Sequence, residues 1–243
     1  MGGFEDFGDA IGDEVELLFN AAHDRIWLPF ERRVGEYLGI PNGDTEPDPL
    51  HWSASESVLM RLFDGYMEIE DSVNCLRNVA VYMRRFPYAR AGVDKAAYLQ
   101  YHVENYLGEV YILQQRVDAY LTVVSRTYRS DASASKIAQA AKAARSQFRS
   151  ALGKPLSTRG AHVHRRRYTD SDLEQLGSLR LLAGVSHPMK REYEKAYREV
   201  RARKREWISS TNQMVEALLD QAFAVLLPLV FDEARRLRQP GAA

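Results

Sequence analysis

The chain has 243 residues, of which 45% are hydrophobic and 27% charged, and its 33 basic side chains balance its 33 acidic ones. This composition excludes a disordered chain and is typical of a soluble globular protein. A single cysteine, Cys75, excludes an intrachain disulfide and favours a reducing compartment; we expect it to be a small core residue. We also expect a cytoplasmic protein without a signal peptide or membrane span, because the longest apolar run, 222–231, is too short to cross a bilayer.

The first predicted element is a helix over about 13–38, which ends in a polar loop rich in glycine and proline. Two longer helices follow over 55–86 and 95–128, each with apolar residues spaced alternately by three and four. Because only a short segment with helix breakers joins them, we expect this pair to be antiparallel. The predicted core positions of the pair are Leu59, Leu62, Tyr66, Ile69, Val73, Leu76, Ala80 and Met83, then Leu99, Val103, Tyr106, Val110, Leu113, Val117, Tyr120 and Val124.

Three further helices are predicted after residue 128. An alanine-rich helix comes first and is expected to end near Gly153 and Pro155. A short helix follows over 170–183, and one long helix covers 186–238. No strand pattern and no internal repeat is visible. The sequence therefore predicts an all-α, up-and-down helical bundle with an N-terminal helix and a long C-terminal helix.

We expect three parts along the chain: an N-terminal helix and polar loop over 1–53, a helical core over 54–185, and a long C-terminal helix over 186–243 packed on the core. The C-terminal helix carries large apolar residues that pack either within the chain or against a second copy. These residues are Trp207, Met214, Leu218 and Phe223.

The charges are unevenly distributed although their sum is zero. No Asp or Glu occurs from Ala132 to Thr169, whereas this segment contains nine basic residues. A local excess of positive charge of this kind attracts polyanions such as RNA. The nine residues are Lys136, Lys142, Arg145, Arg149, Lys154, Arg159, Arg165, Arg166 and Arg167.

The stretch "LSTRGAHVHRRRYTDSDL" (156–173) has the residue types of a phosphate site. Ser157 or Thr158 is expected to cap a new helix, which would place Arg159 beside free backbone N–H groups. Arginine offers a fork that fits two phosphate oxygens, and histidine exchanges protons near neutral pH. Metal-free RNA cleavage needs these two groups: a cation at the phosphorus and an acid or base for the ribose and leaving oxygens.

The run from Arg159 to His164 has the R-x4-H spacing and resembles HEPN domains, α-helical modules of many prokaryotic toxins and antiviral nucleases. The resemblance extends over about residues 54–183 and implies a HEPN-like helical core. It implies a metal-independent endoribonuclease without a cofactor, in which two protomers form a shared cleft. Arg159 would hold the scissile phosphate and His164 would move protons.

Helical spacing adds a second histidine to the candidate catalytic residues. Arg159 and His164 lie about 140° apart around a regular helix. His162 is three residues from Arg159 and lies on its side, so it is the second choice after His164. No carboxylate or cysteine lies close enough in sequence to complete a metal site with the histidines, so we predict none. The candidate RNA-binding residues are Arg165, Arg166, Arg167, Lys154 and Arg149.

Two other functions stay open. Gly160 stands where the family usually has Asn, Asp or His, which favours a non-catalytic module that binds nucleic acid or nucleotides. The chain could instead be the helical partner of a nucleotidyltransferase-type antitoxin. A homodimer is expected from the family resemblance. Glu104, Glu109 and Asp118 belong to the helix expected to face the motif; one could orient the histidine, but a solvated face explains all three.

Overall fold

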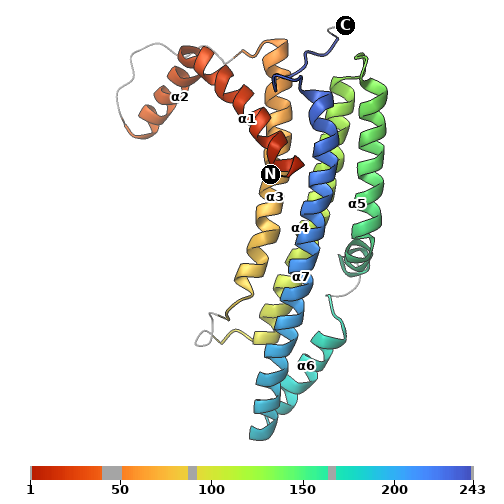
Figure 1. Ribbon diagram of the computed structural model, residues 1–243. Coiled ribbons are helices and arrows are strands. Elements are labelled where there is room, and N and C mark those ends of the chain that lie inside the picture. Colours follow the sequence, from red (N-terminus) through yellow and green to blue (C-terminus); the bar gives the residue numbers. More distant parts are fainter. Residues whose placement is uncertain (1, 40–50, 87–91, 164–167, 242–243) are drawn as a thin grey trace. The chain divides into compact units, whose positions relative to one another are not determined.

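The computed structural model contains seven α-helices, and the ranges that it describes are 2–39, 51–86, 92–163 and 168–241. For residues 154–163, and for several residues of the second helix, it describes the backbone alone. Within these ranges the only β pairing is one isolated bridge, so the predicted all-α class is confirmed. The helices in Figure 1 are α1 (Gly3–Ala21), α2 (His23–Tyr37), α3 (Ala54–Tyr82), α4 (Lys95–Thr127), α5 (Ala134–Val163), α6 (Ser171–Ala183) and α7 (His187–Val230).

The apolar spacing correctly predicted the buried faces of α3 and α4. All of the predicted core positions are buried except Ala80, which is half-buried. The two helices run in opposite directions (Figure 1), as predicted. Their contacts match this orientation: the Tyr98 hydroxyl donates to the carbonyl of Tyr82 at 2.9 Å, and Arg116 Nη1 donates to the carbonyl of Glu68 at 3.0 Å.

The chain divides into two compact units, each with its own core. Unit 1 comprises Met1–Met67, Tyr120–Ala141 and Asp220–Ala243, and unit 2 comprises Glu68–Ala119 and Lys142–Leu219. Helices α3, α4, α5 and α7 have residues in both units. The three parts predicted from the sequence stay a prediction.

Aromatic rings form the core of unit 1. Phe7 is fully buried, and its ring lies edge-on to that of Phe223 with centroids 5.0 Å apart. Tyr120 stacks on Phe223 at 5.6 Å. Edge-on and offset ring pairs add about 0.5–1.5 kcal/mol beyond their area burial. At Gly8 a Cβ atom would overlap the Tyr66 hydroxyl oxygen, so glycine allows α1 to pack this closely on α3.

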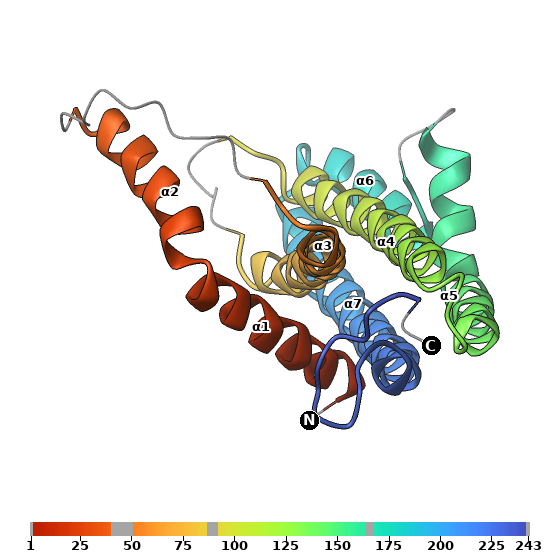
Figure 2. The ribbon, with the colours of Figure 1, turned by 90° about the horizontal axis from the view of Figure 1, so that it is seen from above.

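The N-terminal helix predicted over 13–38 is wrong in two respects. Helix α1 begins at Gly3, and Ala22 separates it from α2 (Figures 1 and 2). The early glycines conceal the helical pattern, but tertiary contacts stabilise the first turn. The N–H of Phe4 donates to Asp220 Oδ1 at 3.1 Å, so an acid from another helix caps an otherwise unpaired N–H of this helix.

The C-terminal helix is shorter than the prediction, which extended it to residue 238. Helix α7 ends at Val230. Beyond it, Asp232 Oδ1 accepts hydrogen bonds from the N–H groups of Ala234 (2.9 Å) and Arg236 (2.8 Å). A side chain that satisfies the backbone in this way competes with helix formation, which explains why the chain turns here.

A buried hydrogen-bonded chain links three helices in unit 2. The Tyr106 hydroxyl donates to Asn212 Oδ1 at 2.8 Å, and Asn212 Nδ2 donates to the carbonyl of Leu76 at 3.2 Å. The Trp207 ring lies edge-on to that of Tyr106, with centroids 5.3 Å apart. Trp207 therefore packs within the chain, as does the fully buried Phe223 in unit 1.

The prediction that Cys75 is a core residue is wrong, because its side chain is exposed. On α3 the buried residues nearest to it are Ser72, Val73, Leu76 and Val79. Cys75 lies beside this row of inward-facing residues, at a position that the helical repeat turns towards solvent.

Among the described helices, α7 is long and apolar enough to cross a membrane by length and composition alone. One third of its apolar 18-residue window (33%) is buried inside the structure. The core helix of a soluble protein passes the same test of length and composition.

Candidate functional site

The predicted catalytic residues fall at the end of α5 and just beyond it. Arg159 and His162 lie on the backbone of α5, one turn apart, whereas their side chains lie outside the described part of the structure. The side chain of Lys154 does so as well. His164 and Arg165, Arg166 and Arg167 lie entirely outside the described residues. Of the predicted RNA contacts, Arg149 is described, and its side chain is exposed.

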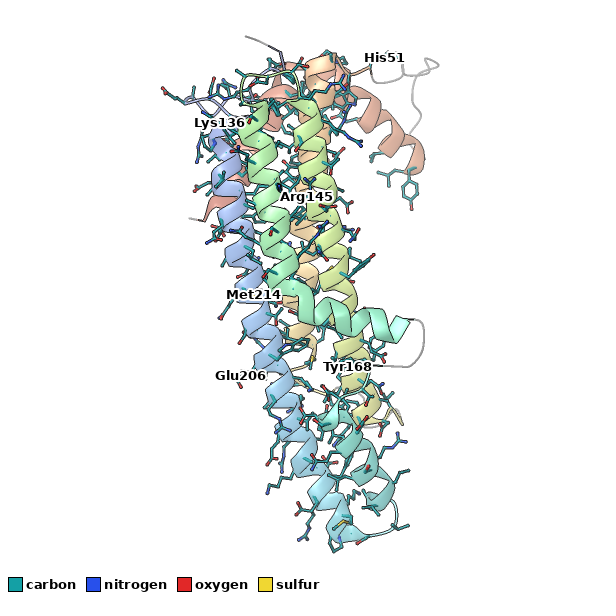
Figure 3. All side chains as sticks on the ribbon, turned by 90° about the vertical axis from the view of Figure 1, so that its right-hand side faces the viewer. His51, Lys136, Arg145, Tyr168, Glu206 and Met214 are labelled. Atoms are coloured by element: carbon teal, nitrogen blue, oxygen red, sulfur yellow. The ribbon has the colours of Figure 1, made fainter. Side chains whose placement is uncertain are left out.

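The prediction that a new helix begins at Ser157 or Thr158 is wrong. Helix α5 continues through Pro155 to Val163, and Figure 3 shows its C-terminal part turning away from its first part. A proline inside a helix removes one hydrogen bond and bends the helix without necessarily ending it. Arg159 therefore lies near the C-terminus of a helix, where carbonyl groups gather and favour cations, and the predicted backbone N–H groups for a phosphate are not there.

The chain is fixed to α4 immediately after this segment, at Tyr168. The N–H of Tyr168 donates to Glu104 Oε1 at 2.9 Å. Gln100 Nε2 donates to the carbonyl of Tyr168 at 2.7 Å and to Glu104 Oε1 at 3.2 Å. The Tyr168 peptide groups are thus bound on both sides by two side chains that lie one turn apart on α4. This arrangement fixes the backbone at the residue that follows the arginine run.

A second set of contacts links the side chain of Tyr168 to Asp170 at the start of α6, and links Asp170 to α7. Its hydroxyl donates to Asp170 Oδ2 at 2.6 Å, and Asp170 caps α6 by accepting from the N–H of Leu173 at 3.1 Å. Lys204 Nζ contacts Asp170 Oδ2 at 2.6 Å and Asp172 Oδ2 at 2.9 Å. Figure 3 labels Tyr168 at this point.

The protonation states in this cluster follow from burial and pairing. Burial raises the pKa of the Tyr168 hydroxyl, and its hydrogen bond to Asp170 raises that pKa further. Burial also tends to raise the pKa of Asp170, but hydrogen bonds from Lys204 and Tyr168 outweigh it and lower that pKa. Burial tends to lower the pKa of Lys204, but its bonds to Asp170 and Asp172 raise it overall. The cluster therefore contains a neutral Tyr168 beside a charged Asp170 and a charged Lys204.

A small groove lies between α4 and α5 within unit 2. Its volume is about 80 Å³. Arg145 lies at the junction of the two helices (Figure 3), where its Nε donates to Asp118 Oδ1 at 2.5 Å and its Nη2 donates to the Asp118 carbonyl at 3.2 Å. Arg149 lines the same groove and has no ion-pair partner within the described ranges. The polar lining residues are Gln114, Gln115, Asp118, Arg145 and Arg149.

One face of α4 connects the Tyr168 contacts with the groove. Gln100, Glu104, Gln115 and Asp118 lie within about 60° of one another at 100° per residue. This polar face runs alongside the buried face that the apolar spacing predicted. The sequence alone allowed Glu104 and Asp118 to be residues of a solvated face. Both instead make the contacts described above.

Sequence reasoning missed Gln100, Gln115 and Lys204, because polar residues on amphipathic helices usually face solvent. The sequence feature that could have revealed the two glutamines is their regular spacing with Glu104 and Asp118 along α4. Within the described residues, no group of three or more His, Cys, Asp or Glu side chains is arranged to hold a metal ion.

Comparisons of the chain with protein-family models, with curated proteins and with solved structures find no match.

Proposed function

We propose that the protein is a metal-independent endoribonuclease of the HEPN type that acts in the cytoplasm as a toxin or defence protein. The R-x4-H spacing from Arg159 to His164, inside a segment with nine basic residues and no acid, is the observation that carries this proposal. The all-α fold is compatible with it. The hydrogen bonds that Glu104 and Gln100 make with the Tyr168 backbone add support, because a catalytic segment needs a fixed backbone.

In the proposed reaction the ribose 2′-hydroxyl attacks the adjacent phosphorus, and the bond to the 5′-oxygen of the next nucleotide breaks. The products are a 2′,3′-cyclic phosphate and a 5′-hydroxyl. His164 takes the proton of the 2′-hydroxyl or gives one to the leaving oxygen, and Arg159 stabilises the charge on the phosphorane. His162, one turn from Arg159 on α5, is the second candidate for the proton transfer.

The test is RNA cleavage by pure protein in EDTA. Arg159→Ala and His164→Ala are expected to lose activity, and His162→Ala shows whether the second histidine takes part. His187→Ala is the matched control, because His187 is exposed at the start of α7. Undiminished cleavage by both the Arg159 and the His164 variants would eliminate the proposal.

A second candidate function is favoured by Gly160: a helical module that binds RNA or nucleotides without cleaving them. It uses the same basic segment but has no chemistry. RNA affinity that falls steeply with salt, together with intact RNA after long incubation, selects this alternative.

We also propose a homodimer, because the two motifs of a HEPN-type nuclease share one cleft, and a nucleotidyltransferase-type antitoxin as a partner. Light scattering of the full chain tests the first, and a mass near one protomer contradicts it. Co-purification with a nucleotidyltransferase encoded by a neighbouring gene tests the second. If such a protein fails to bind the purified chain, the antitoxin proposal falls.

A further inference from the structure

The groove between α4 and α5 carries more positive charge than its ion pair uses. Two arginines and one aspartate line it. Arg145 is paired with Asp118, and the Arg145 side chain is 27% exposed. Arg149 is exposed and has no ion pair with any residue in the described ranges. One guanidinium is therefore available to a negatively charged ligand at the edge of the groove.

The remaining lining residues suit a small oxyanion. Gln114 and Gln115 each bring an amide that donates hydrogen bonds, and the groove has room for a small group. Guanidinium groups bind phosphate oxygens in pairs of parallel hydrogen bonds. The Asp118 carboxylate opposes an anion, but Arg145 Nε holds it at 2.5 Å and neutralises its charge.

We infer that this groove binds a phosphate group of the RNA chain at a position that flanks the cleaved bond. The inference rests on the proposed function for the identity of the polymer. Arg149 makes the contact, Gln114 and Gln115 complete it, and Arg145 neutralises Asp118. Ten residues along α5 separate Arg149 from Arg159, so the groove phosphate and the scissile phosphate are different groups of one strand.

The test measures binding of a fluorescent 2′-O-methyl RNA oligonucleotide, which keeps the phosphates but lacks the attacking hydroxyl. Arg149→Gln is expected to weaken binding about tenfold, as for the loss of a charged hydrogen bond. It is also expected to lower the salt dependence of log K by about 0.7, the value for one phosphate contact on a single strand. Arg126→Gln is the matched control: it removes the same charge from an exposed site on α4, outside the groove and outside the basic segment.

Asp118→Asn separates an anion site from a structural role. If the groove binds phosphate, removing this carboxylate tightens RNA binding, whereas a purely structural Asp118 gives unchanged or weaker binding. Circular dichroism establishes that each variant is folded. Equal affinities and salt slopes for Arg149→Gln and Arg126→Gln overturn the inference, while RNA binding by the unmodified protein leaves the proposed function standing.

If the unmodified protein binds no RNA, the proposed function fails and the groove is tested with inorganic phosphate. A saturable shift of the arginine Nε–H signals in NMR spectra, absent from Arg149→Gln, supports a phosphate site that serves another phosphate compound. No shift up to high phosphate concentration overturns the groove inference as well.

Discussion

The two units of the chain are stabilised by different kinds of contact. In unit 1 the core is built from aromatic rings around Phe7 and Phe223, and glycine lets helices approach closely. In unit 2 a buried chain of hydrogen bonds from Tyr106 through Asn212 joins three helices, and one face of α4 is polar. Unit 2 therefore combines a hydrophobic core with polar side chains that partners hold in place, and its polar contacts include those at Tyr168 and at Asp118.

The largest expected effect is in the aromatic core. Phe7→Ala is expected to lower the free energy of unfolding by about 3–5 kcal/mol, because it leaves a cavity among rings that cannot close in. Denaturant unfolding measures it. Phe4→Ala, at the partly buried edge of the same rings, is the control and is expected to cost less. Equal costs at the two positions would mean that unit 1 has no well-packed aromatic core.

A smaller effect is expected in the polar core of unit 2. Tyr106→Phe removes the hydroxyl and leaves Asn212 Oδ1 buried without that donor, which costs about 1–3 kcal/mol. Tyr101→Phe serves as the control because Tyr101 is 62% exposed. If the Tyr106 variant is as stable as the control, the hydrogen-bonded chain contributes nothing to unit 2.

The third prediction concerns His102 of unit 2 and the dependence of stability on pH. Burial among Tyr82, Tyr98 and Tyr101 lowers the pKa of His102 below its ordinary value of 6.5. The unfolded chain therefore binds a proton before the folded chain does, so stability falls as the pH decreases below 6.5. The slope is at most about 1.4 kcal/mol per pH unit. It levels off below the pKa of the folded state.

His102→Asn is expected to flatten this part of the stability curve, measured by urea unfolding between pH 7 and 5. His187→Asn is the control, since His187 is exposed. Identical curves for the unmodified protein and His102→Asn would show that the burial of His102 has no effect on its titration.

The smallest effect on stability is expected at Glu104. Glu104→Gln keeps the shape but weakens the bonds to Tyr168 and Gln100, at a cost of about 1 kcal/mol. If Glu104 positions the motif segment, kcat for RNA cleavage falls while the affinity for 2′-O-methyl RNA stays the same. Glu109→Gln is the matched control on the same helix. Equal kcat values for the two variants would mean that Glu104 has only a structural role.

The sequence predicted those features of the fold that depend on local periodicity. The apolar faces of α3 and α4, and the start of α6 at Asp170, follow from spacing and capping, which act over a few residues. Helix α5 passes Pro155 although proline usually ends a helix. Buried residues such as Phe148 and Leu152 hold the preceding turns in place, so tertiary packing outweighs the local preference.

The candidate site was predictable only in part. The R-x4-H spacing pointed to Arg159 and His164, and the run of basic residues pointed to Arg149. The contacts of Gln100 and Glu104 with Tyr168 join residues more than sixty positions apart. No local pattern in the sequence encodes such a pairing, which depends on how the helices pack.

The chemistry of the cleaved ends tests the central claim most directly. Pure protein is incubated in EDTA with an RNA and with its 2′-O-methyl counterpart, and the products are weighed by mass spectrometry. The account predicts that the RNA is cut to fragments with 2′,3′-cyclic phosphate and 5′-hydroxyl ends, while the 2′-O-methyl strand stays intact. Cleavage of both strands, fragments with 3′-hydroxyl ends, or no cleavage of either strand would contradict it.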